Sequence, residues 1–468
     1  MRNYGDGIPI AALAAGQGAL ALIRTSGPSS VDLLAAAFSR PEKLRSAPGN
    51  TIVHGWICAP GVPHQRIDEV LVSVYRAPKS YTGEEGADIS CHGGSASVKA
   101  VLEVLRRAGF QDALPGEFTF RAFMNGKLDL TQSESVMELV SARTGAGFER
   151  ALRRLSGLLA KELGEIRALL MEVLSAAELY LDYSEDEIAA SPEELEGTLP
   201  RREAAEEALK RLAALRGGYD RERLYREGAL AVIAGRPNAG KSSLFNLLLR
   251  EDRSIVTAVP GTTRDWIEAV FSLEGIPLRL ADTAGLREEG TAVDAVEAIG
   301  MERSRELLNG ADCILYVIDG ETGILPWDLA FLEKAEGENK KVLAIWNKAD
   351  IAQVPSESIP VLALSAKTGA GVEKLCSALA ELLGGNTLPE IEARDRGQPG
   401  LGSARQKELT DIAFSALKEA LETAERGEAL DIIAPRLRDA LNALGEITGE
   451  VFTADILEAM FSRFCVGK

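Results

Sequence analysis

The stretch "GRPNAGKSS" at residues 235–243 limits the fold of this chain more than any other. Gly235, four further residues, Gly240, Lys241 and Ser242 form the phosphate-binding loop pattern. An apolar run, "ALAVIA", precedes it, and an amphipathic run, "LFNLLL", follows it. The pattern works between a strand and a helix, because the loop N–H groups and the helix N-terminus then face the phosphates. The sequence therefore predicts an α/β domain with a nucleoside triphosphate site.

Two further motifs indicate the nucleotide and its metal ion. Lys241 is expected to reach the β- and γ-phosphates, and the Ser242 hydroxyl to bind Mg²⁺. Asp282, in "RLADTAG", ends an apolar strand where a carboxylate can hold Mg²⁺ through water, and Gly285 can offer a backbone N–H to the γ-phosphate. Asp350, in "AIWNKAD", can accept two hydrogen bonds from the guanine N1–H and N2 amino groups. Adenine lacks that donor pair, so the predicted nucleotide is GTP.

The remaining motifs complete a set of five. "ALSAK" resembles the loop that backs the guanine, and "PGTTRD" lies where the first switch belongs. Together the motifs resemble the Ras-like GTPase superfamily over residues 225–386. The predicted GTP-binding residues are Asn238, Ala239, Gly240, Lys241, Ser242, Ser243, Thr257, Ala258, Val259, Pro260, Gly261, Thr262, Thr263, Asp282, Thr283, Ala284, Gly285, Asn347, Lys348, Ala349, Asp350, Ser365, Ala366 and Lys367. Leu286 stands where Ras-like enzymes carry a water-orienting glutamine, so the catalytic group must come from elsewhere.

The spacing of apolar residues divides the rest of the chain into regions. A chain of 468 residues is too long for one core. Residues 1–120 alternate short β-like and helical runs, which predicts an α+β domain. Residues 121–224 and 387–468 carry apolar residues at helical spacing. The simplest organisation is one α-helical domain into which an α/β GTPase domain, residues 225–386, is inserted.

Composition excludes several other classes. The net charge of −18 is unlike that of a protein that wraps nucleic acid with its whole surface, so a basic RNA-binding surface would be local or supplied by a partner. The cysteines are odd in number and show no CxxC spacing, which argues against a disulfide framework and a zinc site. The chain shows no signal peptide and no apolar run of the ~18 residues that a membrane span needs. A cytoplasmic protein is expected.

Three stretches outside the nucleotide motifs resemble one family. They are "SYTGEEGADISCHGG", "LPGEFTFRAFMNGKLDLTQSE" and the C-terminal "LDIIAPRLRDALNALGEITGEVFTADILEAMFSRFCVGK". They look like the bacterial and organellar tRNA modification GTPase family MnmE, also called TrmE. The most specific part is a GTPase inserted in a helical domain that ends Cys-x-Gly-Lys. One departure is near the start, where the family usually shows Ala-Thr-Pro and this chain has "ALAAGQGALALIRTSG".

The resemblance implies a reaction and its partners. With a FAD-dependent protein of the MnmG (GidA) type, the family places an aminomethyl or carboxymethylaminomethyl group on C5 of the wobble uridine of certain tRNAs. The one-carbon donor it implies is 5-formyltetrahydrofolate or a related tetrahydrofolate. The N-terminal domain would resemble tetrahydrofolate-binding enzymes and form a homodimer, and the GTPase domains would meet when GTP is bound.

The resemblance also implies residue roles in GTP hydrolysis. Ser242 and Thr263 would hold Mg²⁺. K⁺ would stand in place of an arginine finger. Glu297, in "DAVEAIGMERS", would orient the attacking water, with Asp294 as the next candidate and Glu288 or Glu289 after it. The residues implied for K⁺ are Asn238, Thr257, Val259 and Thr262.

The implied folate site is formed by Arg24, Glu84, Lys127 and the terminal Lys468. Cations suit the carboxylates of the folate glutamate, and a carboxylate suits the amino-pyrimidine edge of a pterin. Cys465 points towards this site in the family and is a candidate catalytic residue. The alternative is that it is an ordinary cysteine at the end of the last helix. His92, in "CHGG", is either a turn residue or a catalyst.

Two other functions stay open. A potassium-dependent ribosome-assembly or regulatory GTPase shares the nucleotide motifs, but not the "CVGK" end or the "PGEFTFRAF" region. A folate-dependent one-carbon enzyme with GTP in a purely regulatory role would share both regions. Folate binding by the N-terminal half separates the first alternative from the other functions.

Overall fold

The computed structural model describes residues 4, 7–16, 18–59, 62–182, 199–250, 268–282, 306–354, 359–384 and 399–468. The chain forms two compact units. Unit 1 comprises Met1–Met137, Leu155–Leu212 and Glu408–Lys468, and unit 2 comprises Glu138–Arg154 and Ala213–Lys407. Each unit is described by itself below. The three predicted domain boundaries, after residues 120, 224 and 386, stay predictions.

Unit 1 begins with a six-stranded sheet in the order β3-β4-β5-β2-β1-β6. Its strands are β1 (Ile10–Ala15), β2 (Leu20–Ser26), β3 (Thr51–Ala59), β4 (Val62–Tyr75), β5 (Gly86–His92) and β6 (Gln111–Asp112). Neighbouring strands are antiparallel, except β1 and β6. The helices are α1 (Ser30–Ala36), α2 (Pro41–Arg45) and α3 (Ser95–Ala108). Residues of α1 and α3 share one core with the sheet, while Leu20, Ile52 and Leu71 are exposed. Exposed and buried positions alternate because successive side chains of a strand point to opposite faces, and on β1 the second face is also buried, since Ile10 and Ala12 pack with Phe118.

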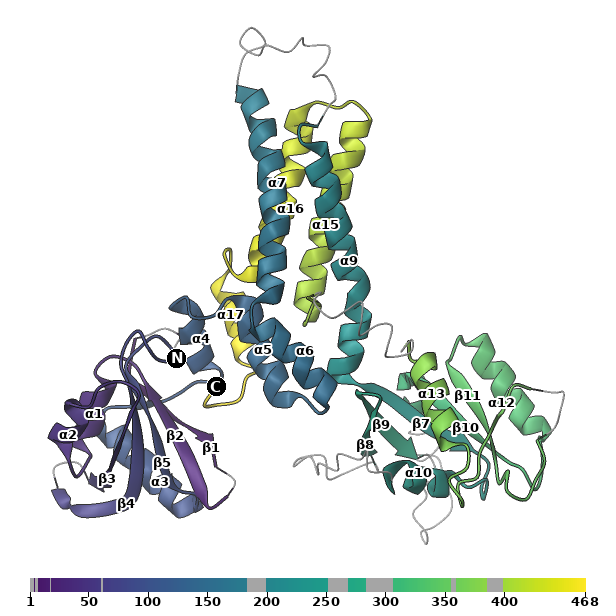
Figure 1. The fold of residues 1–468 in the computed structure, drawn as a ribbon, viewed down its shortest axis with the longest axis horizontal. Helices are drawn as coiled ribbons and strands as arrows, with labels where there is room; N and C mark the ends of the chain where they lie inside the picture. The colour runs from purple at the N-terminus through teal and green to yellow at the C-terminus, as the bar shows by residue number, and fades with distance from the viewer. Residues whose placement is uncertain are drawn as a thin grey trace. The chain divides into compact units, whose positions relative to one another are not determined.

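The helical part is built from segments on both sides of the GTPase sequence. Its helices are α4 (Glu117–Met124), α5 (Leu130–Ser141), α6 (Gly145–Leu155), α7 (Leu158–Asp182), α9 (Arg202–Glu227), α15 (Ala404–Glu425), α16 (Leu430–Thr448) and α17 (Ala454–Phe461). Within unit 1, α7 packs along α16, and Figure 1 shows them side by side. Buried Leu159, Leu163, Ile166 and Leu170 recur at three- and four-residue spacing on α7. The predicted insertion is therefore confirmed.

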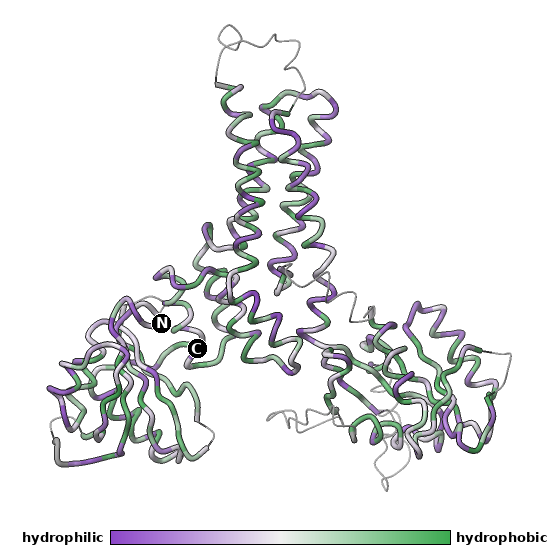
Figure 2. The backbone as a smooth tube through the Cα atoms, in the orientation of Figure 1, coloured by the Kyte–Doolittle hydropathy of each residue, from purple (hydrophilic) through white to green (hydrophobic). Residues whose placement is uncertain are grey.

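Unit 2 contains a second six-stranded sheet, in the order β12-β11-β10-β7-β9-β8. Its strands are β7 (Ala229–Gly235), β8 (Glu268–Leu273), β9 (Ile276–Asp282), β10 (Cys313–Asp319), β11 (Val342–Asn347) and β12 (Leu362–Ala363). Only β8 is antiparallel among these strands. Helices α10 (Lys241–Arg250) and α13 (Val372–Leu382) share a core with one face, and α12 (Pro326–Gly337) with the other. Figure 2 shows the central strands as hydrophobic, as expected for strands covered on both faces.

The predicted fold class is confirmed: an α+β N-terminal domain, a helical domain and an inserted α/β GTPase domain. Within the part of the chain that the structure describes, none of the helices is both long and apolar enough to span a bilayer.

Candidate functional site

The phosphate loop joins the end of β7 to the start of α10. Gly235 has φ +139°, and a Cβ there would lie 2.3 Å from the Val317 carbonyl oxygen. Gly240 has φ +96°, and a Cβ there would lie 2.1 Å from Asn347 Nδ2. Both positions combine a left-handed backbone with close neighbours, so only glycine fits. The glycines of the motif are thus required by the packing of the loop on β10 and β11.

Two polar side chains of the loop lie where phosphate and metal chemistry need them. Lys241 is buried, and its Nζ donates to the carbonyl oxygens of Gly235 (3.0 Å) and Arg236 (2.8 Å). Ser242 Oγ donates to Asp282 Oδ2 at 3.0 Å. A hydroxyl and a carboxylate brought together are the oxygen donors that Mg²⁺ prefers. These residues therefore fit the metal ion predicted from the sequence.

Asn347 holds the phosphate side and the guanine side of the site together. It is 2% exposed. Its Nδ2 donates to the Ala239 carbonyl oxygen at 2.8 Å, and its Oδ1 accepts from the Ala366 N–H at 2.9 Å. One side chain thus joins the phosphate loop to the loop predicted to back the base.

The other residues of the guanine motif are held by local hydrogen bonds. The Ser365 hydroxyl donates to Asp350, and this bond lowers the pKa of the carboxyl more than burial raises it. Asp350 is therefore ionised near neutral pH and able to accept hydrogen bonds from a guanine. Lys348 has φ +63°, and its Nζ pairs with Asp319 Oδ2 at 2.9 Å. Its neighbour Ala349 donates its N–H to the Leu364 carbonyl oxygen at 3.1 Å.

These groups gather at one edge of the sheet. The phosphate loop, Asp282, Asp319 and Asn347 all follow or end the parallel strands β7, β9, β10 and β11. The parallel strands that follow β7 in the chain, β9 and β10, lie on opposite sides of it. Open parallel sheets bind ligands at such a point, beyond the carboxyl ends of the strands. Many residues of the predicted GTPase site lie outside the described residues: Thr257, Ala258, Val259, Pro260, Gly261, Thr262, Thr263, Thr283, Ala284, Gly285, Asp294 and Glu297, together with Leu286, Glu288 and Glu289.

In unit 1, Arg24 and Glu84 of the predicted folate site lie in the N-terminal domain, and Lys127 lies between α4 and α5 of the helical part. Arg24 pairs with both oxygens of Asp88, at 3.0 and 3.2 Å, and its guanidinium carbon lies 5.6 Å from the centre of the Tyr81 ring. Glu84 Oε2 accepts from Ser26 Oγ at 2.7 Å. Lys127 Nζ donates to the Pro78 carbonyl oxygen at 3.2 Å.

Residues 462–468, here called the C-terminal segment, lie against this domain. Gly116 and Phe118, at the start of α4, donate their N–H groups to the carbonyl oxygens of Cys465 (3.3 Å) and Lys468 (3.2 Å). Gly467 has φ +96°, and a Cβ there would lie 2.6 Å from the Leu13 carbonyl oxygen. Figure 1 shows the C-terminus beside the N-terminal domain. The structure thus brings together a thiol, a terminal lysine and the domain predicted to bind folate.

The Cys465 thiol is exposed, whereas Cys58, Cys91, Cys313 and Cys376 are buried. Helix α17 ends at Phe461, so Cys465 lies beyond the last helix. An exposed thiol can contact a bound molecule, whereas the thiols of the four buried cysteines cannot.

His92 ends β5 and is bound to Asp68 of β4. Its Nδ1 lies 2.6 Å from Asp68 Oδ1, and its N–H donates to Oδ2 at 2.9 Å. Ser97 Oγ donates to the same Oδ2 at 2.6 Å. Burial raises the pKa of Asp68, but the hydrogen bonds from Ser97 and His92 outweigh it and lower the pKa overall. These contacts give His92 a structural role at the end of β5, and its catalytic role stays a hypothesis.

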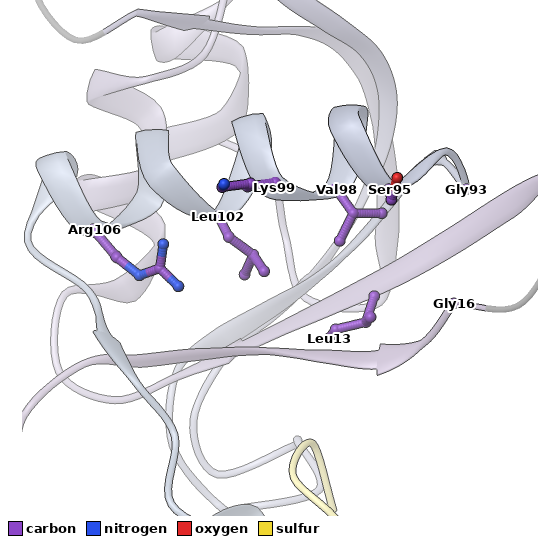
Figure 3. Close-up of a pocket in the computed structure, with 8 residues that line it drawn as sticks. All are labelled: Leu13, Gly16, Gly93, Ser95, Val98, Lys99, Leu102 and Arg106. Carbon is purple, nitrogen blue, oxygen red and sulfur yellow. The ribbon is translucent and has the colours of Figure 1, made fainter. Parts of the chain in front are cut away.

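Unit 1 also has a cavity of about 280 Å³ between β1 and α3. Figure 3 shows Leu13, Val98 and Leu102 facing one another in it, with Lys99 and Arg106 on the same helix. Arg106 pairs with Asp112 at 3.0 Å. None of the residues predicted for GTP or folate lines this cavity.

Sequence reasoning missed Arg121, which contacts Glu84, one of the residues predicted for folate. It is 4% exposed and donates to Glu84 Oε2 at 3.0 Å, Glu117 Oε1 at 2.8 Å and the Ile8 carbonyl oxygen at 2.7 Å. A charged residue inside the apolar run "FTFRAFM" was the available signal, because a buried arginine requires partners.

The sheet order and the nucleotide motifs define a P-loop GTPase. Family models match nearly the whole chain: the MnmE helical domain at residues 130–465 and the GTP-binding protein TrmE N-terminus at residues 9–127. The chain belongs to the MnmE (TrmE) family of tRNA modification GTPases.

Curated relatives match along their full length. The tRNA modification GTPase MnmE of Treponema denticola is 40% identical over 489 residues, which cover 100% of this chain and 99% of the relative. The MnmE of Carboxydothermus hydrogenoformans is 40% identical over 466 residues, which cover 97% of each. The G domain of the T. maritima FeoB iron transporter aligns with a TM-score of 0.24 and 31% identity, over 33% of this chain and 98% of that one. A TM-score this low leaves the fold assignment to the sheet topology described above.

Proposed function

We propose that this protein is a GTP-hydrolysing enzyme that, with a FAD-dependent partner of the MnmG type, adds an aminomethyl or carboxymethylaminomethyl group to C5 of the wobble uridine of certain tRNAs. The observation that carries the proposal is the 40% identity to a tRNA modification GTPase over 100% of the chain. The position of Cys465 and Lys468 on the N-terminal domain supports it, because a purely regulatory GTPase has no use for a thiol there.

GTP hydrolysis is assigned to the loop residues. Lys241 neutralises charge on the β- and γ-phosphates, and Ser242 and Thr263 hold Mg²⁺, which neutralises charge on the phosphate oxygens when bound. Glu297 orients the attacking water, because Leu286 has no polar group for that task. K⁺ is held by Asn238, the backbone of Thr257 and Val259, and Thr262. Hydrolysis that is equally fast in sodium and potassium buffers would contradict this K⁺ site.

Folate is assigned to unit 1. Arg24, Lys127 and Lys468 supply cations for the glutamate carboxylates, and Glu84 supplies an acceptor for the pterin edge. The proposal that these residues suit a folate is supported by Glu84. Its carboxylate is oriented by hydrogen bonds from Ser26, at 2.7 Å, and Arg121, at 3.0 Å. The bound tetrahydrofolate supplies the one-carbon group. Cys465 acts beside it, as an acid/base group or as a transient nucleophile.

The remaining partners complete the proposal. The protein acts as a homodimer through its N-terminal domain, binds tRNA with its flavoprotein partner in a heterotetramer, and works in the cytoplasm. GTP-driven association of the GTPase domains influences modification by favouring one state of the helical domain.

The test is a mass-spectrometric nucleoside profile of tRNA from cells that lack this chain. C5-aminomethyl-type wobble uridines are expected to disappear and to return with the wild-type gene. Lys241→Ala and Cys465→Ser are expected not to restore them. Val466→Ala, which changes the exposed neighbour of Cys465, is the matched control and is expected to restore them.

Two outcomes contradict parts of the proposal. An unchanged profile in the deletion strain would exclude the tRNA function and favour the ribosome-assembly GTPase. Full restoration by Cys465→Ser would remove Cys465 from the chemistry and leave the rest standing.

A further inference from the structure

Residues 319–328 form a connection from the last residue of β10 to the first turn of α12, and they touch both halves of the nucleotide site. On the guanine side, Lys348 Nζ donates to Asp319 Oδ2 at 2.9 Å and to Glu321 Oε2 at 2.6 Å. The Gly320 N–H donates to the Asn347 carbonyl oxygen at 3.0 Å. The guanine motif is therefore anchored at the start of this connection.

The phosphate side is anchored at its other end through Arg236. Arg236 Nη2 donates to the Gly323 carbonyl oxygen at 2.7 Å, and Nε donates to Asp328 Oδ1 at 3.1 Å. Asp328 is fully buried. Its carboxylate also accepts from Tyr316 Oη at 2.9 Å and from the Leu325 N–H at 2.8 Å. A buried carboxylate held by three donors is a rigid anchor for the guanidinium.

The backbone of Arg236 in turn holds the lysine of the phosphate loop. Its carbonyl oxygen accepts from Lys241 Nζ at 2.8 Å, next to the Gly235 carbonyl oxygen at 3.0 Å. Gly235 itself lies against β10, where a Cβ would meet the Val317 carbonyl oxygen at 2.3 Å. Gly235 and Arg236 are thus held in position by their contacts, and their carbonyl oxygens in turn position the Lys241 ammonium group.

We propose that Arg236 is a positioning residue of the GTPase: its guanidinium, anchored on Asp328 and the Gly323 carbonyl, fixes the start of the phosphate loop and thereby places Lys241 for the β-phosphate. Arg236 itself contacts no phosphate in this role. Loss of this anchor should weaken binding only of nucleotides that have a second phosphate, because Lys241 contacts the β-phosphate and not the base or the sugar. The inference rests on nucleotide binding by the family and is independent of the tRNA reaction.

The test compares two donors to the same Asp328 oxygen. Arg236→Lys keeps the charge near Asp328, but an ammonium group lacks the fork that reaches Asp328 and Gly323 together. Tyr316→Phe removes the other donor and leaves the phosphate loop untouched. Calorimetric affinities of the full-length protein for GDP and GMP are measured for both variants, with thermal unfolding as a check on folding.

Arg236→Lys is expected to weaken GDP binding about tenfold, the effect of one charge-assisted hydrogen bond, and to leave GMP binding unchanged. Tyr316→Phe is expected to bind both nucleotides like the wild type. The double variant Arg236→Met with Asp328→Asn avoids an unpaired buried charge, and it is expected to show the same loss for GDP if Arg236→Lys does not fold.

Three results would overturn the inference. Wild-type GDP affinity in Arg236→Lys would show that the loop needs no anchor. Equal losses in Arg236→Lys and Tyr316→Phe would show that only the fold around Asp328 matters. Equal losses for GMP and GDP would mean that the whole site is disturbed and that Lys241 is not specifically affected.

Discussion

At the nucleotide site of unit 2, the polar side chains predicted to bind GTP follow the strands of one parallel sheet, whereas in unit 1 backbone atoms hold the C-terminal segment. Lys241, Ser242 and Asp282 lie within a few residues of strand ends. The C-terminal segment is held by the N–H groups of Gly116 and Phe118, more than 300 residues away in the chain. The first site depends on the identity of these polar side chains as well as on its glycines. The second depends on close backbone approach, so the two are expected to respond to different substitutions.

The largest expected effect is on the nucleotide site. Lys241→Ala is expected to lower GTP hydrolysis at least about a hundredfold, because one preorganised cation is removed from the developing phosphate charge. Hydrolysis by the purified protein at saturating GTP is the measurement. Lys374→Ala, an exposed lysine on α13 in the same unit, is the control and is expected to keep the wild-type rate. A rate within threefold, roughly, of wild type for Lys241→Ala would contradict the assigned role, since that is under 1 kcal/mol of barrier.

The next effect tests backbone approach in unit 1. Gly467→Ala is expected to weaken docking of the C-terminal segment by about 2 kcal/mol, from a strained left-handed residue and a clash with the Leu13 carbonyl. Hydrogen exchange at the Gly116 and Phe118 amides reports this docking. Gly427→Ala is the matched control, since Gly427 has φ +75° but open space around it. Unchanged exchange in Gly467→Ala would mean that the segment does not depend on this contact.

A smaller effect concerns the polar groups that unit 1 satisfies internally. Asp68→Asn is expected to lower the free energy of unfolding by about 1.5 kcal/mol, because hydrogen bonds from His92 and Ser97 to a charged group are weakened. The folded-state pKa of Asp68 is lowered from 3.8, so its contribution is present above pH 3.8 and is lost as the pH falls through the folded-state pKa.

Denaturant unfolding at several pH values checks this prediction. The difference between wild type and Asp68→Asn is expected to be constant above pH 3.8 and to shrink below it. Asp112→Asn, which removes an exposed ion pair with Arg106, is the control. A difference that grows towards acid pH would contradict the assigned sign.

The smallest effect is expected at the surface between the two halves of the helical domain. Arg438 of α16 pairs with Glu178 of α7 at 2.7 Å, and both side chains are exposed. Arg438→Ala is expected to change the free energy of unfolding by no more than about 0.5 kcal/mol. A larger loss in a denaturant titration would mean that α7 and α16 are held by charge and not by the buried leucine faces.

Much of this protein could be predicted from sequence, for a specific reason. The phosphate loop and the guanine motif sit on short connections after β7 and β11, so a few neighbouring residues fix both the chemistry and the local backbone. The helical insertion was also predictable, because apolar residues recur at helical spacing on both sides of residues 225–386. The roles predicted for Cys465 and Lys468 come from resemblance alone, since an isolated thiol has no sequence pattern.

Residues whose chemistry needs a fixed local spacing could be identified without the structure: Gly235, Gly240, Lys241, Ser242 and the guanine motif. The tertiary structure decided which distant groups meet them. Arg236 meets Asp328, 92 positions along the chain, and Glu84 meets Arg121, 37 positions along. Such pairs depend on how helices and strands pack, because packing brings together residues that no local spacing relates.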